Sequence, residues 1–285
     1  MKVQSVLCLV LAVVLSGFGA AVAQDQPGRE RAKDKAGAKP QVGTQPGVRG
    51  GQKLVPPKPP ADVPDDDRPG APPAPAGAGP RTIPPPLESY KGRLIAQTMH
   101  FTGAPWLVRD SRESEERCSL MLATLGVKPG MKICDMGCGN GFYSIQMAKM
   151  AGENGHVYGI DIQPEMLKMM NDRADREGVE NITPILGTPV SPRLPKGQID
   201  LILCVDVYHE FSYPEQMLAA MRESLAPGGR LVLVEFRAED PNVPIKPEHK
   251  MSKAQILKEL NPNGFKLVKE FDKLPWQHMM WFERE

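Results

Sequence analysis

The sequence predicts an α/β fold with a doubly wound, mostly parallel sheet of seven strands, of which the last is antiparallel. Three observations predict this fold. From residue 131 onward, segments with strand character alternate with segments of helical periodicity, which is typical of parallel βαβ units. The run "IDLILCVDV" at residues 199–207 is almost entirely apolar, as in a strand buried on both faces. The link "DKLP" before the last strand leaves no room for a crossover helix, so that strand is antiparallel.

Two zones of different composition precede the predicted domain. Residues 1–23 combine Lys2, an apolar run from Val6 to Leu15 and a small-residue "AVA" ending, which predicts a signal peptide cleaved after Ala23. A transmembrane anchor is the alternative, although the apolar run is shorter than the ~20 residues that span a bilayer. Residues 24–86 hold 16 of the 30 prolines and almost no large apolar residues, which predicts a disordered linker.

Residues 87–285 form the predicted domain, divided into leading helices at 87–125 and a core at 126–285. The leading helices are predicted at residues 87–101 and 111–126, and Ser111 is expected to cap the second one. The second helix places four apolar residues on one face, namely Cys118, Met121, Leu122 and Leu125.

The core alternates strands and helices in chain order. Seven strands are predicted, at residues 131–136, 156–161, 181–186, 199–207, 230–236, 265–271 and 276–285. Four helices are predicted, at residues 142–152, 163–178, 213–229 and 252–264. Pro164 and Gly178 are typical of the first turn and the end of a helix, and Ser252 with Gln255 has the spacing of a capping box.

The stretch "ICDMGCGNGFYS" at residues 133–144 connects the first core strand to its helix. Gly137, Gly139 and Gly141 allow a sharp turn and the close approach of a ligand, so a ligand loop is favoured over a plain turn. Phe142 occupies the place of the third glycine of the dinucleotide fingerprint. Asp161 closes the second strand and is placed to bind ribose hydroxyls, which both nucleoside cofactor types carry.

Three motifs in this order resemble the class I methyltransferases that use S-adenosyl-L-methionine (AdoMet). These motifs are "DMGCGNG", "VYGIDI" and "LAPGGRLVLVE". The resemblance spans roughly residues 126–285, and its nearest look-alikes are small-molecule methyltransferases of the quinone-modifying type. It implies a Rossmann-like class I fold, AdoMet as cofactor and a small-molecule methyl acceptor.

The resemblance also assigns the cofactor contacts. Asp135, Gly137 and Gly139 are expected around the methionine part, and a carboxylate at Asp135 would balance the charge of a sulfonium and an amino group. The other expected contacts are Asp161 to the ribose, Ile162 and Thr188 to the adenine, and Asp206 near the cofactor at the end of the fourth strand. The third-strand exit "LGTPVSPRLPKGQ" departs from the family pattern because it lacks an acidic contact to the adenine amine.

The acceptor side is expected at the tips of the fourth and fifth strands. An activated methyl group requires an aligned acceptor, and oxygen or nitrogen acceptors also need a base. His209 and Tyr208 are the catalytic candidates, and a helix-capping or packing role is the alternative for His209. Further candidates to line the site are Tyr90, Trp106, Arg112, Glu210, Glu235, Arg237, His249, Lys250, Trp276 and His278. The scattered cysteines have no metal-binding spacing, and no metal site is predicted.

Three functions remain open on the sequence alone. An AdoMet-dependent methyltransferase is preferred, followed by a non-catalytic binding or scaffold protein on the same fold and then an NAD-dependent oxidoreductase. The net charge of +1 favours no nucleic-acid partner. Cleavage of the signal peptide predicts a secreted or periplasmic protein. Without cleavage the chain is expected to be cytoplasmic or tethered to a membrane by its N-terminal segment, the one predicted membrane contact.

Overall fold

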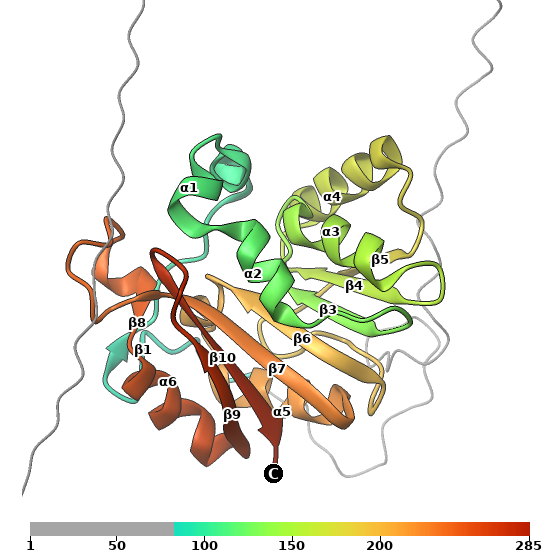
Figure 1. Ribbon diagram of the computed structural model, residues 1–285. Helices are drawn as coiled ribbons and strands as arrows, with labels where there is room; N and C mark the ends of the chain where they lie inside the picture. Colours follow the sequence, from blue (N-terminus) through green and yellow to red (C-terminus); the bar gives the residue numbers. More distant parts are fainter. Residues whose placement is uncertain (1–82) are drawn as a thin grey trace, which may run out of the picture. The chain divides into compact units, whose positions relative to one another are not determined.

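The computed structural model describes residues 83–285 of the chain (Figure 1). The signal peptide predicted at residues 1–23 and nearly all of the linker predicted at 24–86 lie outside the described residues. Within residues 83–285, every helix is too short or too polar to cross a membrane.

A central sheet of seven principal strands has the order β5-β4-β3-β6-β7-β10-β9. Its strands are β3 (Lys132–Met136), β4 (His156–Asp161), β5 (Ile182–Leu186), β6 (Ile199–Val205), β7 (Leu225–Arg237), β9 (Phe265–Phe271) and β10 (Gln277–Arg284). Strands β3 to β7 pair in parallel, and β10 pairs antiparallel with both β7 and β9. The predicted doubly wound sheet with an antiparallel last strand is confirmed. An additional short strand, β8 (Lys250–Met251), pairs with the end of β7.

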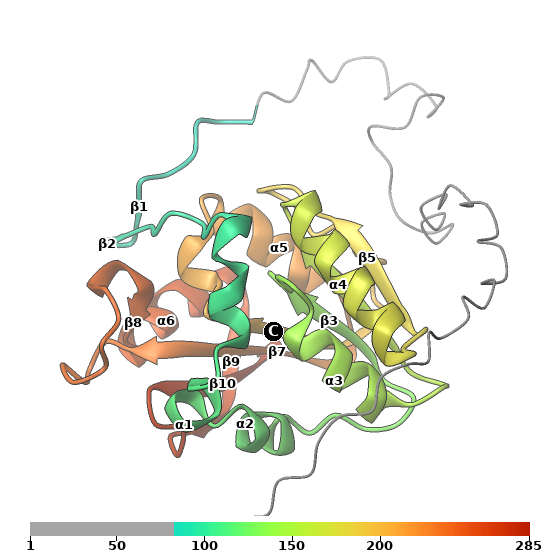
Figure 2. The ribbon, with the colours of Figure 1, turned by 90° about the horizontal axis from the view of Figure 1, so that it is seen from above.

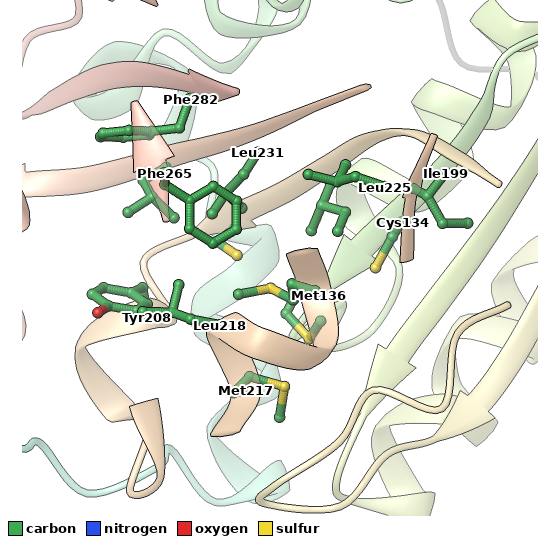
Figure 3. Packing of buried hydrophobic residues seen from close by; sticks show 14 of the residues in the cluster. Cys134, Met136, Ile199, Tyr208, Met217, Leu218, Leu225, Leu231, Phe265 and Phe282 are labelled. Atoms are coloured by element: carbon green, nitrogen blue, oxygen red, sulfur yellow. The ribbon is translucent and has the colours of Figure 1, made fainter. Parts of the chain in front are cut away.

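Helices cover both faces of the sheet (Figure 1). One face carries α2 (Cys118–Leu125), α3 (Phe142–Ala151) and α4 (Pro164–Glu177), and the other carries α5 (Pro214–Ser224) and α6 (Lys253–Leu260). Alternate strand residues point to opposite faces, so one strand supplies both cores. In β3, Ile133 belongs to the core under α2 and α3, whereas its neighbour Cys134 packs in the core under α5 and α6. Figure 3 shows part of this second core.

Several helix boundaries follow the predicted local signals. Pro164 begins α4, and Gly178 ends it in the left-handed conformation at φ +64°. Ser252 caps α6 by accepting a hydrogen bond from the Gln255 N–H at 3.1 Å. The helix predicted at 213–229 ends earlier, because residues 225–229 already belong to β7.

The leading segment differs from its prediction. Residues 87–101 do not form a helix: β1 (Ser89–Tyr90) and β2 (Arg93–Leu94) make a two-stranded hairpin. Its turn residues, Lys91 and Gly92, have φ of +46° and +94°, and positive φ at both positions is typical of a tight hairpin turn. A 3-10 helix, η1 (Phe101–Val108), follows the hairpin.

The second leading helix is broken at Arg117, which has a φ of +51°. The two pieces are α1 (Arg112–Glu116) and α2, and Ser111 makes no side-chain capping bond. The break separates two environments. Cys118 and Met121 in α2 pack against the sheet, whereas Arg112 and Glu116 in α1 line a cavity. Figure 2 shows the leading segment running from β1 and β2 across the molecule to α1 and α2.

Candidate functional site

A cavity of about 610 Å³ lies at the carboxyl ends of β3, β4, β6 and β7. Strand order reverses between β3 and β6, and the ligands of open α/β sheets bind at such a switch point. The volume falls in the range of about 300–1,000 Å³ that is typical of small-molecule sites. Residues of the leading segment, including Met99, Trp106 and Leu107, line the cavity from the other side.

The loop after β3 brings bare backbone to this cavity. Gly137 and Gly139 line it, and both have positive φ. A Cβ on Gly137 would lie 2.4 Å from Val207 Cγ2, and one on Gly139 would lie 2.6 Å from Leu107 Cδ1. A side chain at Gly137 would therefore collide with the stiff Val207, whereas one at Gly139 would require the end of the Leu107 side chain to move. Gly141 instead begins α3 and packs against Met170.

Asp161, at the end of β4, is held by backbone N–H groups. Its two carboxylate oxygens accept hydrogen bonds from the N–H of Gly139 at 3.0 Å and of Gln163 at 2.9 Å. Burial raises the pKa of Asp161, and these hydrogen bonds work against that rise. Beside it Ile162 is 44% exposed, which places an apolar side chain on the cavity wall. Thr188 also lines the cavity, in a turn closed by two backbone bonds with Ser191.

Asp135 is buried behind the glycine loop and is not among the residues that line the cavity. Its carboxylate accepts a hydrogen bond of 2.5 Å from the Ser144 hydroxyl on α3. Burial raises its pKa to about 6, although the Ser144 bond lowers it. Any effect of Asp135 on a ligand is therefore electrostatic, acting through the loop.

Asp206 follows β6 and lines the cavity. Its φ is +52°, and one oxygen accepts a hydrogen bond of 2.6 Å from the Gln277 amide. The other oxygen, Oδ1, is buried and has no hydrogen-bond partner among the described residues. Burial, followed by the nearby Glu116 and Glu235 carboxylates, raises the pKa of Asp206 well above its usual range. A hydrogen-bond donor in the cavity would give Oδ1 a partner, and a cation there would lower the pKa of Asp206.

His209 lines the cavity and lies in a chain of polar side chains. Its Nδ1 is 2.6 Å from Glu235 Oε2, and its Nε2 is 3.1 Å from His249 Nδ1. The other Glu235 oxygen accepts the backbone N–H of Tyr208 at 3.0 Å, so the carboxylate is fixed from two sides. Burial acts to lower the pKa of His209, but the Glu235 carboxylate raises it and the net change is upward. Burial and His209 lower the pKa of His249.

Glu210 lies next to this chain and also lines the cavity. Burial raises its pKa to about 7, although nearby His209 lowers it. The Met99 N–H donates to its Oε1 at 3.4 Å.

Tyr208 points away from the cavity. Its ring packs in the core under α5 and α6, where Figure 3 shows it beside Leu218, and its hydroxyl donates to Glu259 Oε2 at 2.8 Å. Glu259 also accepts two bonds from the Arg93 guanidinium, at 2.7 and 3.0 Å. Arg93 in turn donates to the His209 carbonyl at 2.8 Å. The structure therefore separates the two catalytic candidates, and His209 is the one that lines the cavity.

The other candidates divide in the same way. Four of them line the cavity: Trp106, Arg112, Glu210 and His249. The remaining six are not among the lining residues: Tyr90, Glu235, Arg237, Lys250, Trp276 and His278. Glu235 still contributes by orienting His209.

Two glutamines make contacts at this site that no sequence motif predicted. The Gln163 side chain donates to the Met99 carbonyl at 2.9 Å and accepts from the Phe101 N–H at 2.8 Å, which ties the leading segment to the end of β4. Gln277 binds Asp206 across 71 positions of sequence. Both contacts join segments far apart in the chain, and no local pattern encodes them.

Comparisons with known proteins show which family the chain resembles in sequence. Residues 127–282 match the family model described as a methyltransferase domain. The ubiquinone/menaquinone biosynthesis C-methyltransferase UbiE of Paraburkholderia xenovorans (strain LB400) is 35% identical over 154 residues, 52% of this chain and 63% of that protein. The protein of the same name from Paraburkholderia phymatum is 34% identical over 115 residues, 40% of this chain and 47% of that protein. The chain thus covers about half of the length of one relative and less than two thirds of the other.

A solved structure shares the fold. The crystal structure of a SAM-dependent methyltransferase from Aquifex aeolicus superposes with a TM-score of 0.61, at 24% identity, over 65% of this chain and 98% of that one. At this identity the likeness concerns the fold.

Proposed function

The chain belongs to the methyltransferase domain family, and we propose that it is an AdoMet-dependent methyltransferase acting on a small-molecule acceptor. One observation carries the proposal: a glycine-lined cavity at the switch point is surrounded by buried and half-buried carboxyl groups with raised pKa values. These groups are Asp135, Asp161, Asp206 and Glu210. A cationic ligand lowers the free energy of each ionised carboxyl group, and AdoMet carries a sulfonium and an ammonium group.

The residues present fit this cofactor. Gly137 and Gly139 allow its methionine part to approach bare backbone, with Asp135 as a buried counter-charge behind the loop. The unpartnered Asp206 Oδ1 offers an acceptor to an amino group. Asp161 would hold the ribose, while Ile162 and the turn at Thr188 would border the adenine. When bound, the cofactor supplies a methyl group already activated on sulfur.

The same charges argue against a nicotinamide dinucleotide. A pyrophosphate in this loop would lie close to Asp135 and Asp206 with no lysine or arginine from the loop to compensate. Phe142 also stands where the dinucleotide fingerprint requires a glycine for close packing of helix and sheet.

The proposed acceptor is a ring compound such as a quinol, in keeping with the names of the UbiE relatives. Phe211, Met217 and Phe236 line the cavity and provide apolar walls for a ring. His209 lies in the same cavity, and the Glu235 carboxylate fixes its Nδ1–H. The Nε2 lone pair, which lies 3.1 Å from His249 Nδ1, can then accept a proton from the acceptor or bind a metal ion.

Export of the chain also remains a proposal, because the predicted signal peptide lies outside the described residues. Identification of the N-terminal residue of protein purified from its native host tests it. Cleavage after Ala23 is expected, and an intact Met1 would contradict it.

The full chain should be titrated calorimetrically with AdoMet and with NAD, and then assayed for methyl transfer to quinols and phenols. We expect binding of AdoMet but not of NAD. Asp161→Ala should weaken AdoMet binding by about 10- to 150-fold, since a charged hydrogen-bond acceptor contributes ~1.5–3 kcal/mol. Asp172→Ala is the control, because that carboxylate is exposed on α4 and pairs with Lys168. Absence of AdoMet binding would refute the proposal, and tight binding without turnover would favour the scaffold alternative.

A further inference from the structure

We infer that His209, Glu210 and His249 form a binding site for a divalent transition-metal ion of the zinc class. The three residues, here called the His–Glu–His cluster, each offer one ligand atom, and these atoms all lie within 4.8 Å of one another. Two histidines and one carboxylate are a donor set that suits zinc and iron. All three side chains line the cavity, so further coordination positions of such an ion are open to it.

The spacing of the two imidazoles fits a shared ion. His209 Nε2 and His249 Nδ1 face each other at 3.1 Å, with their rings almost perpendicular. Two nitrogens bound to one zinc ion at about 2.0–2.1 Å lie roughly 2.9 Å apart at a right angle and about 3.4 Å apart at the tetrahedral angle. The observed separation falls between these values, so it is compatible with one ion replacing the hydrogen bond between the two rings.

The hydrogen bonds around His209 orient its ring in the way that metal-binding histidines are usually oriented. A metal-bound histidine typically donates its other ring N–H to a carboxylate, which fixes the tautomer and orients the ring. Glu235 accepts from the His209 Nδ1–H at 2.6 Å, so the ring's lone pair is on Nε2, which faces His249 Nδ1 at 3.1 Å. Arg93 fixes the main chain at the same position by donating to the His209 carbonyl at 2.8 Å.

A metal ion at the His–Glu–His cluster would lie where the methyl acceptor is proposed to bind. An ion at the cluster would take an oxygen ligand from water or from the hydroxyl group of an acceptor. That role in acceptor binding rests on the proposed function, whereas metal binding itself does not. The acceptor class it favours is one that presents a phenolic or enolic oxygen.

The test is calorimetric titration of the full chain with ZnCl₂ after removal of metals by a chelator, with MgCl₂ in a parallel titration. One zinc ion per chain is expected, with magnesium at least about 100-fold weaker, because magnesium prefers an all-oxygen shell. His249→Ala and Glu210→Gln should each weaken zinc binding at least about 10-fold. Substitution with Co²⁺ should produce visible absorption bands that disappear in His249→Ala.

The chain offers a matched control. All five histidines lie in the described residues, and His156 is on β4, where its Nε2 bonds the Thr183 hydroxyl outside the cavity. His156→Ala should bind zinc like the unaltered chain. Equal zinc binding by His249→Ala, or no stoichiometric binding by the unaltered chain, overturns the inference.

A separate titration with AdoMet, on metal-free protein, keeps the two claims apart. Zinc binding without AdoMet binding retains the metal site and removes the proposed function. AdoMet binding without zinc binding retains the proposed function and removes the metal site. His209 would then remain as a base for the reaction.

Discussion

The two ends of the cavity satisfy their polar groups by different means. At the cofactor end, Asp161 is held by the backbone N–H groups of Gly139 and Gln163. At the acceptor end, side chains hold side chains: Glu235 binds His209, and Arg93 reaches from the leading hairpin to Glu259. Backbone donors are present whatever the neighbouring side chains are, whereas each side-chain pair depends on both partners. Loop geometry therefore sets the contacts of Asp161, whereas residue identity sets those of His209 and also those of Asp135 and Asp206, whose donors are the Ser144 and Gln277 side chains.

This difference predicts where substitutions act. At the cofactor end, a change of backbone conformation should destabilise the fold, whereas removal of a buried charge should stabilise the fold and weaken ligand binding. At the acceptor end, removal of one partner should leave a buried charge without compensation. The following predictions run from the largest expected effect to the smallest.

Glu259→Gln should destabilise the fold most, by ~3–5 kcal/mol. Glu259 is fully buried and accepts hydrogen bonds from Arg93, the Tyr208 hydroxyl and Gln255. Loss of its charge leaves the Arg93 guanidinium, only 11% exposed, without a counter-ion, and breaking a buried ion pair costs this amount. Chemical denaturation measures the change.

Glu283→Gln is the control for this prediction. It breaks a pair with Arg230 whose side chains are 40% and 46% exposed, and exposed pairs contribute ~1 kcal/mol or less. Similar losses of unfolding free energy in the two variants would show that the buried network contributes no more than an exposed ion pair.

Asp135→Asn should stabilise the protein at pH 7.5 by up to ~3 kcal/mol. Burial raises the Asp135 pKa in the folded chain from its ordinary 3.8 to about 6, a difference that corresponds to ~3 kcal/mol. The folded state thus binds the proton more tightly, so stability is fully present below pH 4 and is lost as the pH rises through 6. Asparagine can still accept the Ser144 hydroxyl bond and carries no such penalty.

The measurement is the free energy of unfolding of Asp135→Asn and of the unaltered chain at pH 4, 5, 6 and 7.5. The difference should grow with pH and level off above 6. AdoMet affinity should fall in the variant, because the counter-charge behind the loop is gone. A constant difference at all four pH values would contradict the buried, ionised carboxylate.

Gly137→Ala should cost ~2–3 kcal/mol. A non-glycine residue at φ +68° is strained by about 1 kcal/mol, and the added Cβ would lie 2.4 Å from the stiff side chain of Val207. Overpacking of this kind adds ~1 kcal/mol or more.

Gly197→Ala separates the two contributions, because Gly197 has a similar φ of +67° but no atom within 4 Å of the added Cβ. It should cost only the ~1 kcal/mol of backbone strain. Equal melting temperatures for the two variants would show that the loop yields easily to a side chain.

Ile162→Ala should have the smallest effect, ~1 kcal/mol on AdoMet affinity and less on folding. The side chain is 44% exposed, so the fold buries only part of it, and a bound adenine would cover the rest. Calorimetry with AdoMet and thermal melting measure the two quantities. A large loss of stability with unchanged affinity would place Ile162 in the core instead of the binding site.

Features encoded by local signals could be predicted from the sequence. The end of α4 at Gly178 and the capping of α6 by Ser252 each depend on residues a few positions apart. The glycine loop and Asp161 could be predicted in the same way, since the loop follows β3 and Asp161 is the last residue of β4. Both lie at the cofactor end, whereas α6 carries Glu259 of the acceptor end.

The leading segment and the acceptor end could not be predicted to the same extent. The hairpin at β1 and β2 depends on positive φ at Lys91, a residue that rarely adopts it. The predicted role of Tyr208 rested on its place at the tip of the fourth predicted strand, but the distant Glu259 binds its hydroxyl in the core. The pairing of His209 with His249 requires the chain to return after 40 residues, and periodicity carries no information about such a contact.

The Gln163 amide couples two contacts of the leading segment to one side chain. It supplies both the donor to the Met99 carbonyl and the acceptor for the Phe101 N–H, so a single substitution at Gln163 removes both bonds together. Other bonds hold the same segment, among them those of the Met99 N–H to Glu210 and of Asn140 to the Ala104 carbonyl. Loss of Gln163 would therefore loosen residues 99–101 at the end of β4 without releasing the rest of the segment.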